Sequence, residues 1–147
     1  MPESEAPKGT LLGFDFGLRR VGVAVGQTQT HTASVLVTLV NTVALLEEVD
    51  ELIRQWRPAG LVVGLPLDSE GHETQMSRQA RQFGASLADR YQLPVLFEDE
   101  RLSSQAVDQT FADQRAAGIR RKKDSRLKDA MAAQLILQNW LQSQAIG

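Results

Sequence analysis

Hydrophobic positions follow two different periods along the chain. Up to about residue 40, apolar and β-branched residues come in short runs, whereas from Val43 onward they recur every three or four positions. The first pattern predicts three strands, over residues 10–16, 21–26 and 33–40. Because only short turns separate these strands, an antiparallel meander is favoured.

The second pattern predicts helices that alternate with short strands. Apolar residues from Val43 to Trp56 share helical spacing, and the Pro58-Ala59-Gly60 sequence ends that helix. Apolar runs at residues 61–65 and 94–97 are typical of strands buried on both faces. Further helices are expected over residues 75–91, 103–117 and 125–142.

This order of elements indicates an α/β fold. A meander followed by β-α-β crossovers gives a mixed five-stranded sheet with helices on both faces, and the order resembles that of a ribonuclease-H-like fold. A doubly wound parallel sheet is the alternative, disfavoured because no helix separates the first three strands. The polar residues 1–9 are expected to form a flexible N-terminus, and residues 10–142 a single domain.

Composition excludes several kinds of site. The 147 residues include no Cys and two His, which excludes disulfides and thiolate zinc sites and disfavours a His-rich metal site. No apolar run approaches the ~18 residues of a membrane span, and the first residues are too acidic for a signal peptide. We therefore expect a soluble, cytoplasmic protein without a membrane partner.

Charge is distributed unevenly. Net charge is −2, but residues 1–100 hold fourteen acids and eight bases, and residues 101–147 hold four acids and eight bases. A basic patch on an otherwise acidic protein suits a polyanion such as RNA or DNA, although a solvated loop would give the same pattern. Most of the basic residues lie close together: Arg115, Arg120, Arg121, Lys122, Lys123, Arg126 and Lys128.

Asp15 is a carboxylate in the middle of a predicted apolar strand, where burial is costly unless something pairs with the charge. Alternation places Asp15, Gly13 and Gly17 on one face and the two flanking Phe residues on the other. The glycines leave space beside the carboxylate for a ligand. A turn-capping Asp is the structural alternative.

Two further acidic positions could join Asp15. The Glu98-Asp99-Glu100 sequence ends a later strand, with Glu98 and Glu100 on the same face, and strand ends are where α/β sheets bind ligands. Asp129 lies in the first turn of the predicted helix over residues 125–142, just before its apolar stretch from Ala130 to Leu137, where the helix dipole alone would favour an acid. Together such carboxylates could hold Mg²⁺ or Mn²⁺, and two ions ~4 Å apart can activate a water against a phosphodiester.

Four blocks of residues resemble, in order and over residues 10–141, the YqgF (RuvX) family of ribonuclease-H-like nucleases. The blocks are residues 13–17 with Arg20, Gly22, Val23 and Ala24; residues 63–67 with Gly71; residues 99–104; and Asp129 with Ala132, Ala133, Ile136 and Leu137.

The resemblance implies metal-dependent phosphodiester hydrolysis, with Asp15, Glu100 and Asp129 as catalytic metal ligands. It selects Glu100, where alternation leaves Glu98 equally eligible. It also implies a bacterial cytoplasmic protein that acts on the precursor of 16S ribosomal RNA at its 5′ end, on Holliday junctions, or on both. The residues expected to contact nucleic acid are Arg20, Arg101, Arg120, Arg121, Lys122, Lys123 and Arg126.

Some features depart from the family pattern or fit other functions. Gly26-Gln27-Thr28 stands where the family often has an acid, so a further ligand would come from Glu98, Asp99, Asp108 or Asp124. The alternative function is a nucleic-acid-binding module without catalysis. The Gly-x-Asp-x-Gly turn also resembles the phosphate loop of actin-like ATPases, but those need a duplicated domain. The sequence leaves open a monomer or a homodimer.

Overall fold

The five strands form one mixed sheet, as predicted. In the computed structural model, which describes residues 6–100 and 124–146, the sheet order is β3-β2-β1-β4-β5. Strands β1 (Thr10–Phe16), β2 (Arg20–Gln27) and β3 (Thr32–Val40) form an antiparallel meander. Strand β4 (Gly60–Leu65) pairs parallel with β1, and β5 (Val95–Asp99) pairs parallel with β4. The carboxyl ends of β1, β4 and β5 therefore meet at one edge.

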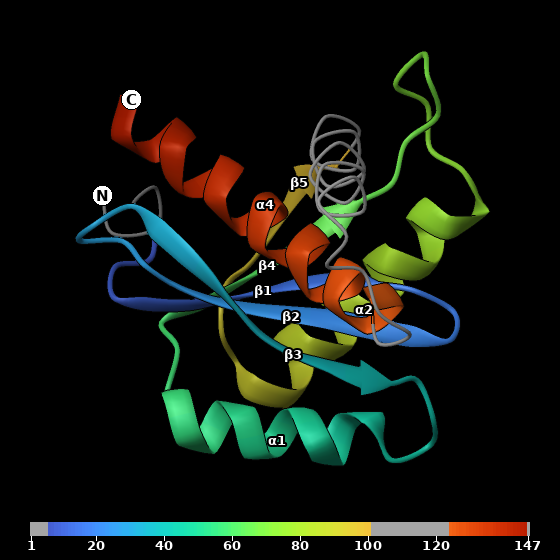
Figure 1. Cartoon of the computed structure of the whole chain (residues 1–147), viewed down its shortest axis with the longest axis horizontal. Helices are drawn as coiled ribbons and strands as arrows, with labels where there is room; N and C mark the ends of the chain where they lie inside the picture. The colour runs from blue at the N-terminus through green and yellow to red at the C-terminus, as the bar shows by residue number, and fades with distance from the viewer. Residues whose placement is uncertain (1–5, 101–123, 147) are drawn as a thin grey trace.

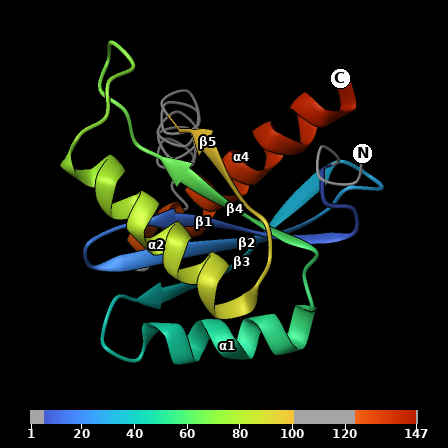
Figure 2. The ribbon, with the colours of Figure 1, turned by 180° about the vertical axis from the view of Figure 1, so that it is seen from behind.

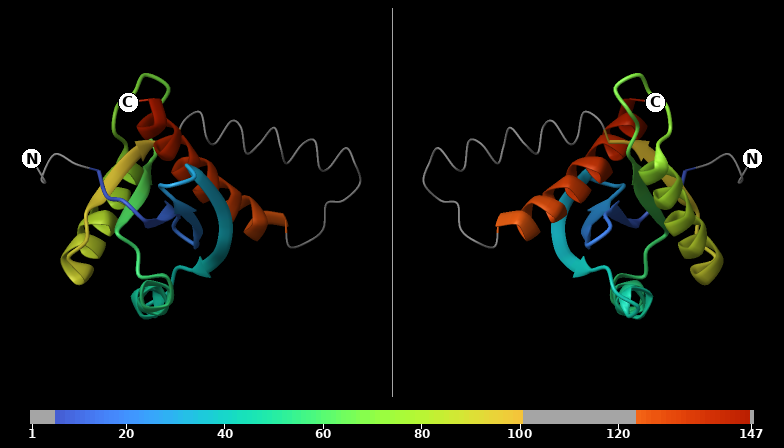
Figure 3. Two further views of the ribbon diagram at one scale, coloured as in Figure 1. Left: turned by 90° about the vertical axis from the view of Figure 1, so that its left-hand side faces the viewer. Right: turned by 90° about the vertical axis from the view of Figure 1, so that its right-hand side faces the viewer.

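Helices cover both faces of this sheet. Helices α1 (Leu45–Trp56) and α2 (Gln75–Tyr91) lie on one face, and α4 (Asp124–Ile146) runs diagonally across the other (Figures 1 and 2). Figure 3 shows the sheet edge-on between α2 and α4. The helix predicted over residues 103–117 lies outside the described residues.

The bounds of α2 match the prediction because both of its ends carry local signals. The Thr74 hydroxyl accepts a hydrogen bond from the Ser77 N–H at 3.3 Å, and the Ser77 hydroxyl accepts one from the Thr74 N–H at 2.8 Å. This reciprocal pair is a capping box. At the other end, Gln92 adopts the left-handed conformation that closes a helix, two residues before Pro94.

The two faces of the sheet differ in the size of their side chains. The face under α1 and α2 carries large apolar residues that pack with Phe83 and Leu87 into one buried cluster: Leu12, Phe14, Val21, Val23, Leu61 and Val63. The face under α4 carries Leu11 and Val62 together with smaller residues such as Ala24 and Ala33, and its cluster is completed by helix residues such as Ile136, Leu137 and Trp140.

Glycines on the second face let α4 lie directly on the strands. A Cβ atom at Gly22 would overlap the backbone carbonyl oxygen of Asp129, and one at Gly13 would lie 2.8 Å from the Leu137 Cβ. Since no side chain larger than hydrogen fits at Gly22, the first turns of α4 are positioned against β2 by backbone contact.

Helix α4 also bonds to the outer edge of β3. The Ala33 N–H donates to the Gln138 Oε1 at 2.9 Å, and the Gln134 Nε2 donates to the Ala33 carbonyl at 3.0 Å. The Gln138 Nε2 donates to the His31 carbonyl at 2.7 Å. These side-chain amides satisfy backbone groups beside β3, which is the outermost strand of the sheet in the described part of the chain.

Helix α1 begins later than the spacing from Val43 predicts. Val43 shares the helical spacing of α1 but is fully exposed, because the chain turns at residues 42–44 and α1 begins only at Leu45. The Leu45 N–H donates to the Thr42 carbonyl at 3.0 Å within this turn. Within residues 6–100 and 124–146, no helix combines the length and apolar character needed to cross a membrane.

Candidate active site

Asp15 lies one residue before the end of β1, on the face covered by α4. Its cross-strand partner on β2 is Gly22, so no side chain stands beside the carboxylate there. Phe14 and Phe16 point to the other face, where both rings contact Phe83. The alternation predicted from the sequence is therefore confirmed, and it directs Asp15 toward α4.

Asp129 lies close to Asp15 because the α4 backbone crosses β2 at Gly22. The negative charge of Asp129 acts on Asp15, and burial together with this charge raises the pKa of Asp15 to about 6. On the β2 side, the Arg20 Nε lies 2.7 Å from the Asp129 Oδ2, which makes an ion pair.

Glu100 directly follows β5 and continues its pairing with β4. The Glu100 N–H donates to the Leu65 carbonyl at 3.3 Å. The side chain lies over Gly64, where a Cβ atom would collide with the Glu100 Oε2 and with Ile136. This Oε2 is buried and has no hydrogen-bond partner among the described residues. Burial, and then the charges of Asp15 and Asp99, raise the pKa of Glu100 to about 8.

Of the two glutamates that share this face, Glu100 is the one that interacts with Asp15. The pKa of Glu98 is raised by burial and by Asp99. The structure thus brings Asp15 next to both Asp129 and Glu100, at the edge where parallel strands end. Alternation alone could not choose between Glu98 and Glu100, because the choice depends on the space above Gly64.

The donor set of these three carboxylates fits a hard divalent cation. Within residues 6–100 and 124–146, no three acidic or imidazole groups already converge tightly enough to cage an ion. Two observations nevertheless fit a cation at this place: the unpartnered Glu100 Oε2 and the pKa values of Asp15 and Glu100, which burial and the neighbouring acids raise. A nearby cation would favour the ionised form of both carboxylates.

The remaining predicted site residues lie at various distances from this cluster. Arg126 is exposed on the first turns of α4, three residues before Asp129, and Asp99 alternates onto the opposite face from Glu98. Sequence reasoning missed the contact of Arg20 with Asp129, because only the crossing of α4 over β2 reveals it. Residues outside the described part, or with side chains outside it, are Arg101, Asp108, Arg120, Arg121, Lys122, Lys123 and Asp124.

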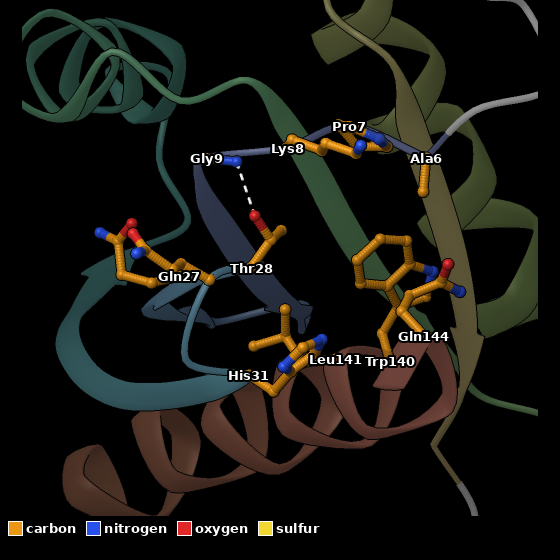
Figure 4. A pocket seen from close by; sticks show the side chains of 11 residues that line it. Ala6, Pro7, Lys8, Gly9, Gln27, Thr28, His31, Trp140, Leu141 and Gln144 are labelled. Atoms are coloured by element: carbon orange, nitrogen blue, oxygen red, sulfur yellow. Dashed lines mark hydrogen bonds between the residues drawn. The ribbon is translucent and has the colours of Figure 1, made fainter. Parts of the chain in front are cut away.

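A groove at the opposite end of the sheet is separate from the carboxylates. It lies between the start of β1, the β2–β3 turn and the end of α4 (Figure 4). Trp140, Leu141 and His31 line it together with Lys8, and none of its lining residues in the described part of the chain is acidic. The chemistry predicted for Asp15 therefore belongs to the strand ends and not to this groove.

Comparisons with known proteins show the family to which the chain belongs. The sequence profile of the RuvX family, described as Holliday junction resolvase, matches residues 9–143. A protein of Xylella fastidiosa (strain M12) named "Putative pre-16S rRNA nuclease" is 46% identical over 145 residues, covering 96% of this chain and 94% of the relative. A protein of the same name from Xanthomonas euvesicatoria pv. vesicatoria (strain 85-10) is 44% identical over 146 residues, with the same coverage of both chains.

Solved structures of resolvases share the fold. Thermus thermophilus RuvC in complex with a Holliday junction superposes with a TM-score of 0.58 at 18% identity, covering 93% of this chain and 96% of that one. The Fowlpox virus resolvase bound to Holliday junction DNA gives a TM-score of 0.58 at 10% identity, covering 92% and 98%. These similarities confirm the ribonuclease-H-like sheet, and the sequence matches show that the chain belongs to the RuvX family of nucleases.

Proposed function

We propose that this chain is a divalent-metal-dependent nuclease that hydrolyses phosphodiester bonds, with Asp15, Glu100 and Asp129 as its metal ligands. The substrates that its relatives' names suggest are the precursor of 16S ribosomal RNA and the Holliday junction. The proposal assigns no catalytic role to the groove beside Trp140.

The observation that carries the proposal is the pairing of Asp15 with Glu100. Both carboxylates are held on one face at the strand ends, and one buried oxygen, the Glu100 Oε2, lacks a partner among the described residues. A purely structural carboxylate is expected to be hydrogen-bonded when buried. An unpartnered one that also faces a second acid suits a site built for a cation.

Each residue would have a distinct task. Mg²⁺ or Mn²⁺ bound here would supply Lewis-acid chemistry, activating a water and stabilising the leaving oxygen. Asp15, between Asp129 and Glu100, orients the site from the rigid centre of the sheet. Arg126, on the exposed side of α4, and the basic residues 120–123 would contact the phosphate backbone.

The test is cleavage of a substrate panel by the wild-type protein and by the Asp15→Asn and Glu100→Gln variants. The panel contains a four-way DNA junction, single-stranded DNA, single-stranded RNA and a 5′-extended 16S rRNA precursor, each with Mg²⁺, Mn²⁺ or a chelator. The Glu70→Gln variant is the matched control, because Glu70 lies in an exposed loop with its side chain 78% exposed.

The proposal predicts metal-dependent cleavage by the wild-type and Glu70→Gln proteins and none by the other two variants. The preferred substrate then identifies the cellular role. If all four proteins bind nucleic acid but none cleaves any substrate with any metal, the chain is a binding module and the proposal is wrong.

A further inference from the structure

The Arg20–Asp129 ion pair joins a residue at the start of β2 to the helix that crosses it. The Arg20 Nε and the Asp129 Oδ2 are 2.7 Å apart, and the two side chains are 36% and 26% exposed. Gly22, two residues along β2, brings the Asp129 backbone onto the strand. Arg20 and Gly22 are two positions apart on β2 and so lie on the same face of the sheet. The helix that crosses β2 at Gly22 therefore brings Asp129 within reach of the Arg20 side chain.

Arg20 compensates only one of the three acids. Asp129 is the only carboxylate among the described residues that forms an ion pair with Arg20. Beyond the effect of burial, the negative charge of Asp129 still raises the pKa of Asp15, and the charge of Asp15 raises the pKa of Glu100. The positive charges of Arg20 and Lys128 act on Asp129, whereas Asp15 and Glu100 respond to burial and to the neighbouring acids.

We propose that Arg20 and the divalent cation compete for Asp129, so that Arg20 occupies this ligand in the metal-free protein and is displaced when the cation binds. This inference rests on the proposed function, because it assumes that Asp129 is a metal ligand. Once displaced, the guanidinium is available to a phosphate of the substrate.

The physical argument has two parts. A guanidinium at hydrogen-bond distance from Asp129 lies within a few ångströms of any cation bound by the same carboxylate, and two positive charges at that separation repel each other. Arg20 can also turn away from Asp129, since 36% of its side chain is exposed and the rest of the guanidinium group can follow it toward solvent, although the two contacting atoms, the Arg20 Nε and the Asp129 Oδ2, are buried.

The competition has a consequence for the order of binding. A nucleic-acid phosphate that attracts Arg20 also frees Asp129 for the cation, so substrate and metal strengthen each other's binding. By thermodynamic linkage the effect is reciprocal. Without substrate, Arg20 weakens metal binding and keeps the isolated protein less active.

The experiment is a Mn²⁺ titration of the full chain without nucleic acid, followed by electron paramagnetic resonance of the free ion. It compares the wild type with Arg20→Gln, Arg20→Lys and Arg19→Gln. Arg19 is the matched control: it is the neighbouring exposed arginine, and its loss removes the same charge at nearly the same place. Thermal unfolding of each variant establishes that it is folded.

We expect Arg20→Gln to bind Mn²⁺ about 5 to 10 times more tightly than the wild type, a coupling of typical size. Arg19→Gln should change the affinity less than twofold, and Arg20→Lys should stay near the wild type because an ammonium can still pair with Asp129. A folded Arg20→Gln protein that binds Mn²⁺ no more tightly than Arg19→Gln overturns the inference.

The two proposals fail in different ways. If the wild type and Asp15→Asn bind Mn²⁺ equally weakly, the carboxylates are not a metal site and the proposed function is wrong. If the wild type binds Mn²⁺ through Asp15 but Arg20→Gln gains nothing over Arg19→Gln, only the competition is wrong.

Discussion

The two faces of the sheet are made by the same strands but serve different ends. On the face under α1 and α2, Leu12 and Phe14 of β1 are fully buried among large side chains. On the face under α4, the same strand presents Gly13 and Asp15, which give up apolar burial for close helix contact and for charge. Alternation lets one strand stabilise the fold and position the acids at the same time.

The largest expected effect separates these roles. Asp15→Asn should lower the cleavage rate by at least ~1,000-fold, because it removes the central carboxylate. It should leave thermal stability unchanged or higher at pH 8 without metal, since the buried charge opposes folding there. Cleavage assays and calorimetry on the same preparation measure both quantities. A large loss of stability would mean that Asp15 mainly stabilises the fold, as Leu12 and Phe14 on the other face do.

Gly22→Ala should affect both roles. Its Cβ would overlap the Asp129 carbonyl, so α4 must shift away from β2. We expect about 100-fold slower cleavage from the displaced carboxylate and a loss of about 1–3 kcal/mol in the free energy of unfolding. Gly26→Ala is the control, because its Cβ would lie 3.0 Å from the Leu137 and Leu141 side chains and from the Thr32 carbonyl oxygen, and not against Asp129. Equal effects of the two changes would contradict the backbone contact.

Leu12→Ala should affect stability alone. The side chain is fully buried on the face away from the acids, so its truncation should lower the free energy of unfolding by about 2–5 kcal/mol. Cleavage per folded molecule should stay within about twofold of the wild type at 20 °C. Urea unfolding and cleavage rates check this, and a large drop in activity would show that the two faces are not separable.

Glu100→Gln should change how stability depends on pH in the absence of metal. The pKa of Glu100 is raised to about 8, whereas Glu in an unfolded chain titrates near pH 4. The folded protein therefore binds more protons between these values, and its stability falls as the pH rises through this range. At pH 8 in chelator, Glu100→Gln should unfold a few degrees higher than the wild type, and at pH 4 the difference should vanish. A lower unfolding temperature at pH 8 would contradict the assignment.

The smallest effect concerns binding. Arg126→Gln removes an exposed charge three residues before Asp129. The slope of the logarithm of nucleic-acid affinity against the logarithm of salt concentration should therefore become shallower by about one unit. Arg54→Gln, on α1 beneath the other face, should leave it unchanged. Fluorescence anisotropy over a range of salt concentrations measures both. Similar slopes for the two variants would place the nucleic acid elsewhere.

The sequence was sufficient for the fold where signals were local. The capping residue Thr74 and Pro94 bracket α2, and alternation assigned Asp15 to its face. The hydrophobic spacing was misleading at Val43, which fits the helical pattern but precedes the helix, because residues 42–44 form a turn and α1 begins at Leu45.

The arrangement of the acids depended on contacts between distant residues. The register of β4 and β5 places Glu98 opposite Gly64, and only the side-chain packing shows that the Glu100 carboxylate lies over this glycine. Likewise, only the crossing of α4 over Gly22 joins Arg20 to Asp129. Neither contact has a periodicity or a motif of its own. The resemblance to the family selected Glu100 without giving the physical reason.

The hydrogen bonds between the side-chain amides of Gln134 and Gln138 and the backbone at β3 have a consequence for synthesis of the chain. Ala33 and Gln138 are 105 residues apart, so these backbone groups of the sheet edge stay without their partner until Gln138 has left the ribosome. An open edge can pair with a strand of another molecule. A chain truncated before Gln134 should therefore aggregate during synthesis. Helix α4, which brings Asp129 to the other acids, thus also covers the exposed edge of the sheet as the protein folds.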